Sequence, residues 1–243
     1  MKKNVAILIH QLANGGAERV ASNLSLYLSD DKYNKFIIIN NDERLEYPYQ
    51  GQLINLGTKV KSNIIGKFLN IIKRIHKLRK IKKNYKIDVT ISLLSSANIN
   101  NILSRRNDKV IVSVRNFISK ELKGFYGKLN KLSIKCLYNK ADEVVVVSKA
   151  IKEDLVKNFG LKENKIKVIY NPYDIVKINQ LAEEEIAEDQ IKIFNNPIII
   201  TAGRLSEQKG QWHLIRAFKK VKFEIPDAKL IILGQGELKD YLR

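Results

Sequence analysis

Two glycine-bearing loops have the residue types and spacing to bind an anion. The first, Gly15-Gly16-Ala17-Glu18-Arg19, follows the apolar run at residues 5–9. The second follows the run at residues 198–200 and contains Gly203-Arg204-Leu205 and then Gln208-Lys209-Gly210. Glycine lets a ligand approach the backbone, and a helix that begins after such a loop offers unpaired N–H groups. Because Arg204 and Lys209 add charges that suit a diphosphate, we predict one anionic ligand between two α/β units.

The segments around these loops alternate between strand-like and helical patterns, which predicts βαβ units, a parallel sheet covered on both faces and the α/β class. Ser148 is placed to cap one helix, which ends near Gly160. Strands are expected at residues 5–9, 36–39, 53–56, 89–93, 109–114, 143–147, 166–170, 198–200 and 229–233. Helices are expected at 17–28, 64–83, 98–104, 120–138, 149–160 and 211–222, with a short one within 173–196. Ligands of open α/β sheets bind beyond the strands' carboxyl ends, where the glycines of both loops fall.

Motif-like stretches occur in a characteristic order along the chain. They are Gly15-Gly16-Ala17-Glu18-Arg19-Val20, Val147-Ser148-Lys149-Ala150-Ile151 with Asp154-Leu155, Val168-Ile169-Tyr170-Asn171-Pro172, Gly203-Arg204-Leu205 with Gln208-Lys209-Gly210, and Leu233-Gly234-Gln235-Gly236-Glu237-Leu238. In this order the chain resembles the retaining glycosyltransferases of family 4 (group 1), which have the GT-B fold.

The resemblance implies two Rossmann-like units with parallel sheets. Residues 1–172 would form the N-terminal acceptor domain, 173–196 the interdomain connection, and 197–243 the start of the C-terminal donor domain. In the family, the second domain continues to an acidic motif with two glutamates that contacts the donor sugar. That motif is not present up to Arg243, so we expect the second unit to be incomplete and the chain to be a fragment.

The resemblance also implies a donor site. Arg204 and Lys209 match the family's pair that binds the donor diphosphate, and fixed cations there would stabilise the leaving group. The loops with Gly15, Gly16, Gly203, Gly234 and Gly236 would contact substrate. Each feature also has a plainer interpretation, as surface cations in a loop or as glycines that close turns. The implied enzyme is a retaining hexosyl- or N-acetylhexosaminyl-transferase, with a nucleotide-sugar donor that we expect to be UDP-linked.

The acceptor side is less defined. Many relatives have a histidine after the strand that corresponds to residues 109–114, but this chain has Arg115-Asn116, so no catalytic residue is assigned. Arg115 is a candidate for a lipid phosphate, and His10, at the end of the first strand, is a candidate cleft residue. The sequence contains no Cys/His cluster, no Asp-x-Asp and no G-x-x-x-x-G-K-[ST], so we expect neither a metal nor a cofactor.

The positive charge is concentrated in the first domain. Residues 1–180 carry 34 basic and 15 acidic side chains, whereas residues 181–243 carry 10 of each. No acidic residue lies between Tyr47 and Ile87, where apolar residues follow helical steps: Ile64, Phe68, Ile71, Ile72, Ile75 and Leu78. A basic amphipathic helix is typical of a membrane-surface element, so we predict apolar residues toward lipid and lysines toward head groups. A core-packed helix with a solvated basic face is the alternative.

These observations predict a cytoplasmic protein, peripheral to the inner face of the cytoplasmic membrane, that acts on a lipid-linked or oligosaccharide acceptor in surface polysaccharide biosynthesis. No apolar stretch approaches the roughly 18 residues needed to span a bilayer, and no secretory signal is evident. The only cysteine, Cys136, is expected in the core. The alternative function is that of a catalytically incomplete basic domain that binds membrane or nucleic acid. Because few aromatics interleave the basic residues, we do not expect nucleic acid as a partner.

Overall fold

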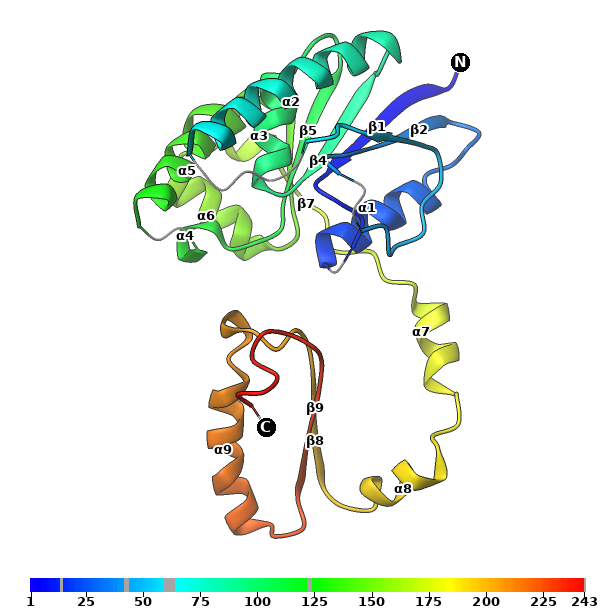
Figure 1. Ribbon diagram of the computed structural model, residues 1–243, viewed down its shortest axis with the longest axis vertical. Helices are drawn as coiled ribbons and strands as arrows, with labels where there is room; N and C mark the ends of the chain where they lie inside the picture. Colours follow the sequence, from blue (N-terminus) through cyan, green and yellow to red (C-terminus); the bar gives the residue numbers. More distant parts are fainter. Residues whose placement is uncertain (14, 42–43, 59–63, 122–123, 243) are drawn as a thin grey trace. The chain divides into compact units, whose positions relative to one another are not determined.

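In the computed structural model the chain forms two compact α/β units, Met1–Tyr173 and Asp174–Arg243. The structure describes residues 1–13, 15–41, 44–58, 64–121 and 124–242, without the side chains of residues 64–65, 67–68, 120–121, 124–130 and 189. Parallel strands and helices alternate in both units, so the predicted α/β class is confirmed (Figure 1).

The first unit contains a parallel sheet of seven strands in the order β3-β2-β1-β4-β5-β6-β7. The strands β4 and β5 have the predicted bounds. The strands are β1 Lys3–Ile9, β2 Tyr33–Ile39, β3 Gln52–Asn55, β4 Val89–Leu93, β5 Lys109–Val114, β6 Glu143–Val146 and β7 Ile166–Val168. Because every neighbouring pair is parallel, all the carboxyl ends lie at one edge of the sheet.

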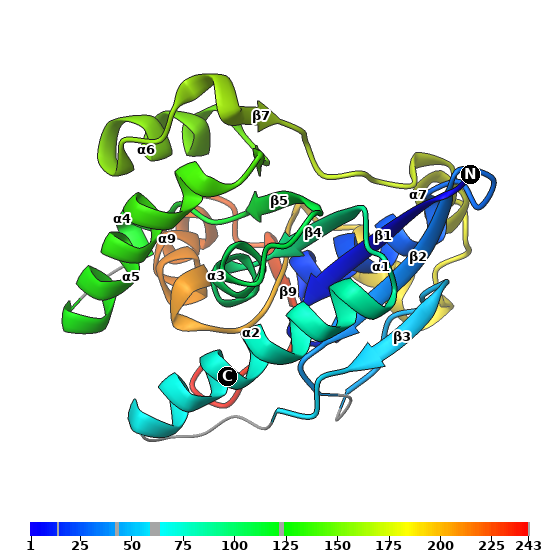
Figure 2. The same ribbon diagram turned by 90° about the horizontal axis from the view of Figure 1, so that it is seen from above.

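Helices cover both faces of this sheet. Ile7 and Ile9 of β1 pack with α1, whereas Ala6 and Leu8 pack with residues of α2 and α3 on the other face. Figure 2 shows α2 and α3 beside each other. The predicted helix at 120–138 is two helices, α4 and α5. The helices are α1 Gly16–Tyr27, α2 Ile64–Asn84, α3 Ser95–Leu103, α4 Ile118–Glu121, α5 Gly124–Leu137 and α6 Lys149–Phe159, with 3-10 turns at Tyr138–Lys140 and Glu163–Lys165.

The ends of α6 agree with the sequence. The Ser148 hydroxyl accepts a hydrogen bond from the Ile151 N–H at 3.2 Å, which satisfies one unpaired donor of the first turn. Gly160 ends the helix with a φ of 64°, a left-handed conformation that glycine adopts without steric penalty.

The orientation predicted for the basic helix is wrong in part. Leu78 of α2 is fully buried and packs with Leu56 and Ile87 against the sheet, not toward lipid. Two basic residues, Arg74 and Lys82, share this buried face. Ile64 and Phe68, assigned to the same apolar stripe, lie outside the described side chains. The exposed face of α2 instead carries Leu69, Ile72, Lys73, His76, Arg79, Lys80 and Lys83.

The expectation for Cys136 is also wrong, because this residue is exposed on α5. Ile134 and Tyr138, four residues apart, face the core and are fully buried. A residue midway between them along a helix points to the opposite side, which here is solvent.

The second unit contains a parallel pair of strands, β8 Ile198–Ala202 and β9 Lys229–Leu233, in which Ile198 lies opposite Lys229. Along the chain, the two strands are connected by a 3-10 turn at Glu207–Lys209 and the helix α9, Gln211–Glu224. The short helix predicted within 173–196 is two helices, α7 Ile175–Ala182 and α8 Glu188–Phe194.

Candidate functional site

The carboxyl edge of the seven-stranded sheet has a topological switch point between β1 and β4. β1 pairs with β2 on one side and with β4 on the other, so the chain leaves β1 and β4 toward opposite faces. A crevice at such a point is where open α/β sheets bind ligands. Gly15, Gly16 and His10 follow β1 at this edge.

The two glycines after β1 have different surroundings. Gly15 is the N-cap of α1, and a Cβ there would lie 2.0 Å from Glu18 Oε2, so the Glu18 carboxylate is folded back over Gly15. A Cβ on Gly16 would meet no atom within 4 Å. Gly15 is therefore explained by the local packing of the first turn, whereas the side of Gly16 is open to a ligand.

His10 is fixed by a neighbouring strand end. Its Nδ1 accepts a hydrogen bond from the Asn40 side-chain amide at 2.9 Å, and the Asn40 N–H donates to the His10 carbonyl at 3.0 Å. The half-buried ring is thus held against the end of β2 at the switch point.

Leu94, directly after β4, has a backbone conformation that sequence reasoning missed. Its φ of 76° and ψ of 151° are rare for a residue with a side chain, and α3 begins at the next residue. Such conformations destabilise a protein by about 1–3 kcal/mol and cluster at functional sites. No sequence signal marks it, because leucine at this position is unremarkable.

Arg115 is held at the same edge, two strands from the end of the sheet. This half-buried residue follows β5, and its Nη2 donates to the Asn171 side-chain oxygen, beyond the end of β7. Burial lowers the pKa of the Arg115 guanidinium from its ordinary value, while the charges of Tyr173 and Glu18 oppose this change. The first unit therefore gathers His10, Gly16 and Arg115 at one edge.

In the second unit, the loop after β8 has an extensively hydrogen-bonded backbone. The Gly203 N–H donates to the Leu233 carbonyl at 2.9 Å, and the Leu205 N–H donates to the Gln235 carbonyl at 2.9 Å. The Leu205 carbonyl accepts from the Leu238 N–H at 3.1 Å. This loop presents Arg204 and Lys209, both exposed, just before α9 begins. The hydrogen-bonded backbone fixes the points from which the Arg204 and Lys209 side chains project.

The glycines after β9 allow this contact between loops. A Cβ on Gly234 would lie 1.9 Å from the Gly203 carbonyl oxygen, and one on Gly236 would lie 2.1 Å from the Leu205 carbonyl oxygen. Close backbone packing alone is sufficient to require glycine at both positions, so their role in substrate binding stays a prediction. Gly203, by contrast, has no atom within 4 Å of its notional Cβ, which leaves that side open.

Gln211 is a second residue that sequence reasoning missed. It begins α9, is buried, and donates from Nε2 to the Arg204 carbonyl at 2.8 Å. The backbone at Arg204 and Leu205 is thus supported by α9 on one side and by the loop after β9 on the other. A glutamine after a glycine is too common a pattern to have revealed this contact.

Within the described ranges, no group of three His, Cys, Asp or Glu side chains is arranged to hold a metal ion. None of the helices in the described part of the chain is both long and apolar enough to cross a membrane.

Two family profiles match the chain, "Glycosyltransferase Family 4" over residues 14–177 and "Glycosyl transferases group 1" over residues 182–243. An uncharacterized glycosyltransferase of Methanocaldococcus jannaschii is 37% identical over 203 residues, which are 79% of this chain and 50% of the relative. The N-acetylgalactosamine-N,N'-diacetylbacillosaminyl-diphospho-undecaprenol 4-alpha-N-acetylgalactosaminyltransferase of Campylobacter jejuni is 33% identical over 247 residues, 99% of this chain and 65% of the relative.

Solved structures agree with these matches. The crystal structure of Anabaena HepE in complex with UDP and glucose has a TM-score of 0.68 and 18% identity, over 98% of this chain and 63% of that one. The chain thus spans between half and two thirds of the length of these three proteins. The likeness confirms that the fold is of the GT-B type.

Proposed function

Since this chain belongs to family 4 (group 1) of the glycosyltransferases, we propose that it transfers a sugar from a nucleotide-sugar donor to a hydroxyl group of a glycan acceptor, with retention at the anomeric carbon. The observation that carries the proposal is the loop after β8, in which a hydrogen-bonded backbone presents Arg204 and Lys209 before α9. Breaking the sugar–phosphate bond leaves charge on a nucleoside diphosphate, and cations that are already in place stabilise that charge.

We infer a UDP-linked donor, supported by the UDP bound in the Anabaena relative. The transferred group is a hexose or an N-acetylhexosamine, and the open sides of Gly16 and Gly203 give a ligand access to the backbone. Gly15, Gly234 and Gly236 shape the loops that border this ligand. Gly15-Gly16 of the first unit and Gly203-Arg204 of the second unit are each proposed to contact substrate.

For the acceptor we propose a lipid-linked glycan of surface polysaccharide biosynthesis. The name of the Campylobacter relative describes such an acceptor, on diphospho-undecaprenol. Arg115, held at the carboxyl edge by Asn171, offers a cation for a phosphate there, and His10 offers a ring that is held by Asn40. Both are proposed to lie on the acceptor side.

A lipid-linked acceptor requires access to a membrane, and the exposed face of α2 supports a peripheral location at the cytoplasmic face. Two large aliphatic side chains, Leu69 and Ile72, are about half exposed next to the cations Lys73, Lys80 and Lys83. Each basic residue close to an anionic leaflet adds about 1 kcal/mol of binding energy. Contact through this face leaves Leu78 in the core.

Calorimetric titration of the chain with UDP tests the donor assignment. Arg204→Ala or Lys209→Ala should weaken UDP binding by about tenfold or more, because each removes a charge-assisted contact to the diphosphate. Arg204→Lys should also bind poorly, since a point charge replaces a planar fork. The matched controls are Arg216→Ala and Lys219→Ala, which remove the same charges from exposed positions of α9. Equal UDP affinity in all four alanine variants would contradict the assignment.

Transfer itself is measured with a radiolabelled UDP-sugar and a lipid extract as acceptor. We expect label in the lipid-linked glycan fraction and a fall on the order of 100-fold in the Arg204→Ala variant. Label that never leaves the nucleotide with wild-type protein would instead favour a binding protein without transferase activity.

A further inference from the structure

Three residues at successive turns of α2 face the sheet: Arg74, Leu78 and Lys82, with 9%, 0% and 3% of their surface exposed. Leu78 lies over the middle of the sheet. Lys82 lies near the amino edge, beside Asp108, which precedes β5. Arg74 lies near the carboxyl edge, where it contacts Thr58, three residues beyond the end of β3. Arg74 is therefore on the edge of the sheet that also carries the switch point.

The two buried cations differ in what neutralises them. Lys82 Nζ lies 2.8 Å from Asp108 Oδ2. Among the described residues the hydrogen-bond partners of Arg74 are neutral: Nε donates to the Thr58 hydroxyl at 2.8 Å and Nη2 donates to the Thr58 carbonyl at 3.3 Å. Among the residues that the structure describes, no carboxylate forms an ion pair with Arg74. Burial lowers the pKa of the Arg74 guanidinium from its ordinary value. A buried charge without a counter-charge destabilises a fold, so its retention calls for an explanation.

Thr58 connects Arg74 to the end of β1. The Thr58 N–H donates to the Asn40 carbonyl at 2.9 Å, and Asn40 in turn binds the His10 ring through its side-chain amide. This chain of hydrogen bonds runs along the carboxyl ends of β1, β2 and β3. It holds the guanidinium in one place relative to the switch point.

We propose that Arg74 is the positive charge of a second anion site, which binds the phosphate oxygens of a phosphate- or diphosphate-containing ligand at the carboxyl edge of the first unit. The guanidinium keeps N–H donors beyond the two that Thr58 uses, and its planar fork matches phosphate oxygens. A bound anion would place a negative charge beside Arg74, with which none of the described carboxylates forms an ion pair. The identification of the ligand as the diphosphate of a lipid-linked acceptor rests on the proposed function, but the anion site does not.

The test separates this site from the proposed donor site. The starting protein is the full chain with Arg204→Ala and Lys209→Ala, titrated calorimetrically with inorganic diphosphate and, in parallel, with UDP at low salt. We expect diphosphate binding to persist in this background. Adding Arg74→Gln should weaken it by about tenfold or more, whereas adding Arg79→Gln should change it less than about twofold. Arg79 is the matched control because it is an exposed arginine of the same helix that donates to the Leu103 carbonyl.

A purely structural role for Arg74 gives a different result, in which Arg74→Gln lowers thermal stability but leaves diphosphate affinity unchanged. That result, or the absence of diphosphate binding in the starting protein, would overturn the proposal. If Arg74→Gln does not fold, Thr58→Val tests the same point, because it removes the hydroxyl that orients Nε and should weaken diphosphate binding several-fold. UDP binding that survives Arg204→Ala and Lys209→Ala intact would refute the donor site and not this one.

Discussion

Lys82 Nζ and Asp108 Oδ2 lie 2.8 Å apart, and neither side chain is exposed to solvent. Asp108 also accepts from the Thr90 hydroxyl at 2.8 Å, and Lys82 donates to the Asn101 side-chain oxygen at 2.8 Å. Four elements or their flanking residues therefore meet at one ion pair: α2, α3, β4 and the residue before β5. The pair fixes the basic helix to the amino edge of the sheet.

Removing the carboxylate should destabilise the first unit strongly. In Asp108→Asn, Lys82 stays buried without its counter-charge, so we expect a loss of about 3–5 kcal/mol in the free energy of unfolding at pH 7. Urea denaturation followed by circular dichroism measures it. Glu143→Gln is the control, because its partner Lys109, at 2.7 Å, belongs to a solvent-exposed pair that should contribute less than about 1 kcal/mol. Similar losses in both variants would show that burial of the pair has no energetic importance.

The same pair predicts how acid affects stability. Burial by itself raises the pKa of Asp108, but the charge and hydrogen bond of Lys82, with the Arg106 N–H and the Thr90 hydroxyl, bring it below its ordinary value. Asp108 therefore binds a proton more readily in the unfolded state than in the folded state. The stabilisation of the fold by ionised Asp108 is complete above the ordinary aspartate pKa of about 3.9 and is lost as pH falls below it. Wild-type stability should drop between about pH 4 and pH 2 more steeply than that of Asp108→Asn. Parallel pH profiles of the two proteins would count against the lowered pKa.

Gly236→Ala should disturb the second unit, because the added Cβ would collide with the Leu205 carbonyl. Leu205 is held in place because its carbonyl accepts from the Leu238 N–H and its N–H donates to the Gln235 carbonyl. We expect a loss of about 1–3 kcal/mol. Trp212, the only tryptophan, lies on α9, so its fluorescence reports unfolding of this unit. Gly203→Ala is the control, expected within about 0.5 kcal/mol of wild type because its Cβ meets no atom within 4 Å. A Gly236→Ala variant as stable as the control would mean that the loops separate easily.

Arg115 and Asn171 should behave as a coupled pair. Each alanine substitution alone should destabilise the first unit by about 1.5–3 kcal/mol, since the bond involves a charged donor and is half buried. The double variant should lose little more than either single variant. A double-mutant cycle in urea measures the coupling, and additive losses would place the two residues in independent environments.

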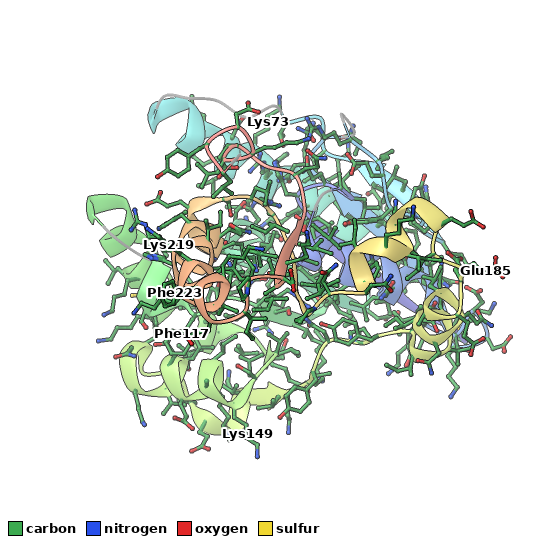
Figure 3. The ribbon with its side chains drawn as sticks, turned by 90° about the horizontal axis from the view of Figure 1, so that it is seen from below. Lys73, Phe117, Lys149, Glu185, Lys219 and Phe223 are labelled. Carbon is green, nitrogen blue, oxygen red and sulfur yellow. The ribbon has the colours of Figure 1, made fainter. Side chains whose placement is uncertain are left out.

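The exposed face of α2 gives a prediction for vesicle binding. Replacing Lys73, Lys80 and Lys83 with glutamine should weaken sedimentation with phosphatidylglycerol vesicles by about tenfold or more, and binding of the wild type should fall as salt screens the charges. The control replaces Lys149, Lys157 and Lys162, exposed residues near α6, which changes the net charge equally. Figure 3 shows Lys73 and Lys149 at opposite margins of the first unit. Equal binding by both triple variants would mean that vesicle binding depends on net charge alone. Retention of the wild-type protein on an oligonucleotide column would favour a nucleic-acid partner.

Local patterns were sufficient to predict most of the elements, as the bounds of β4 and β5 and the cap at Ser148 illustrate, although the helices expected at 120–138 and within 173–196 are each two helices. They failed where a residue's surroundings depend on distant parts of the chain. Arg74 and Lys82 look like members of a solvated basic stripe, and only the fold reveals that Asp108, 26 residues after Lys82, neutralises one of them. Gly236 could be assigned to a turn, but its contact with Leu205 depends on how two loops meet. Periodicity indicates which face is apolar, not which cation has a buried partner.

The contact between the loops after β8 and β9 has a consequence for protein engineering. It is made by main-chain atoms: Gly203 bonds Leu233 at the end of β9, and Leu205 bonds Gln235 and Leu238. It therefore does not depend on which side chains project from the loops. A chimera that exchanges these loops between enzymes should move them as a pair and keep both glycines after β9. Side chains at the exposed positions Arg204 and Gln235 can then be varied while the course of the backbone stays the same.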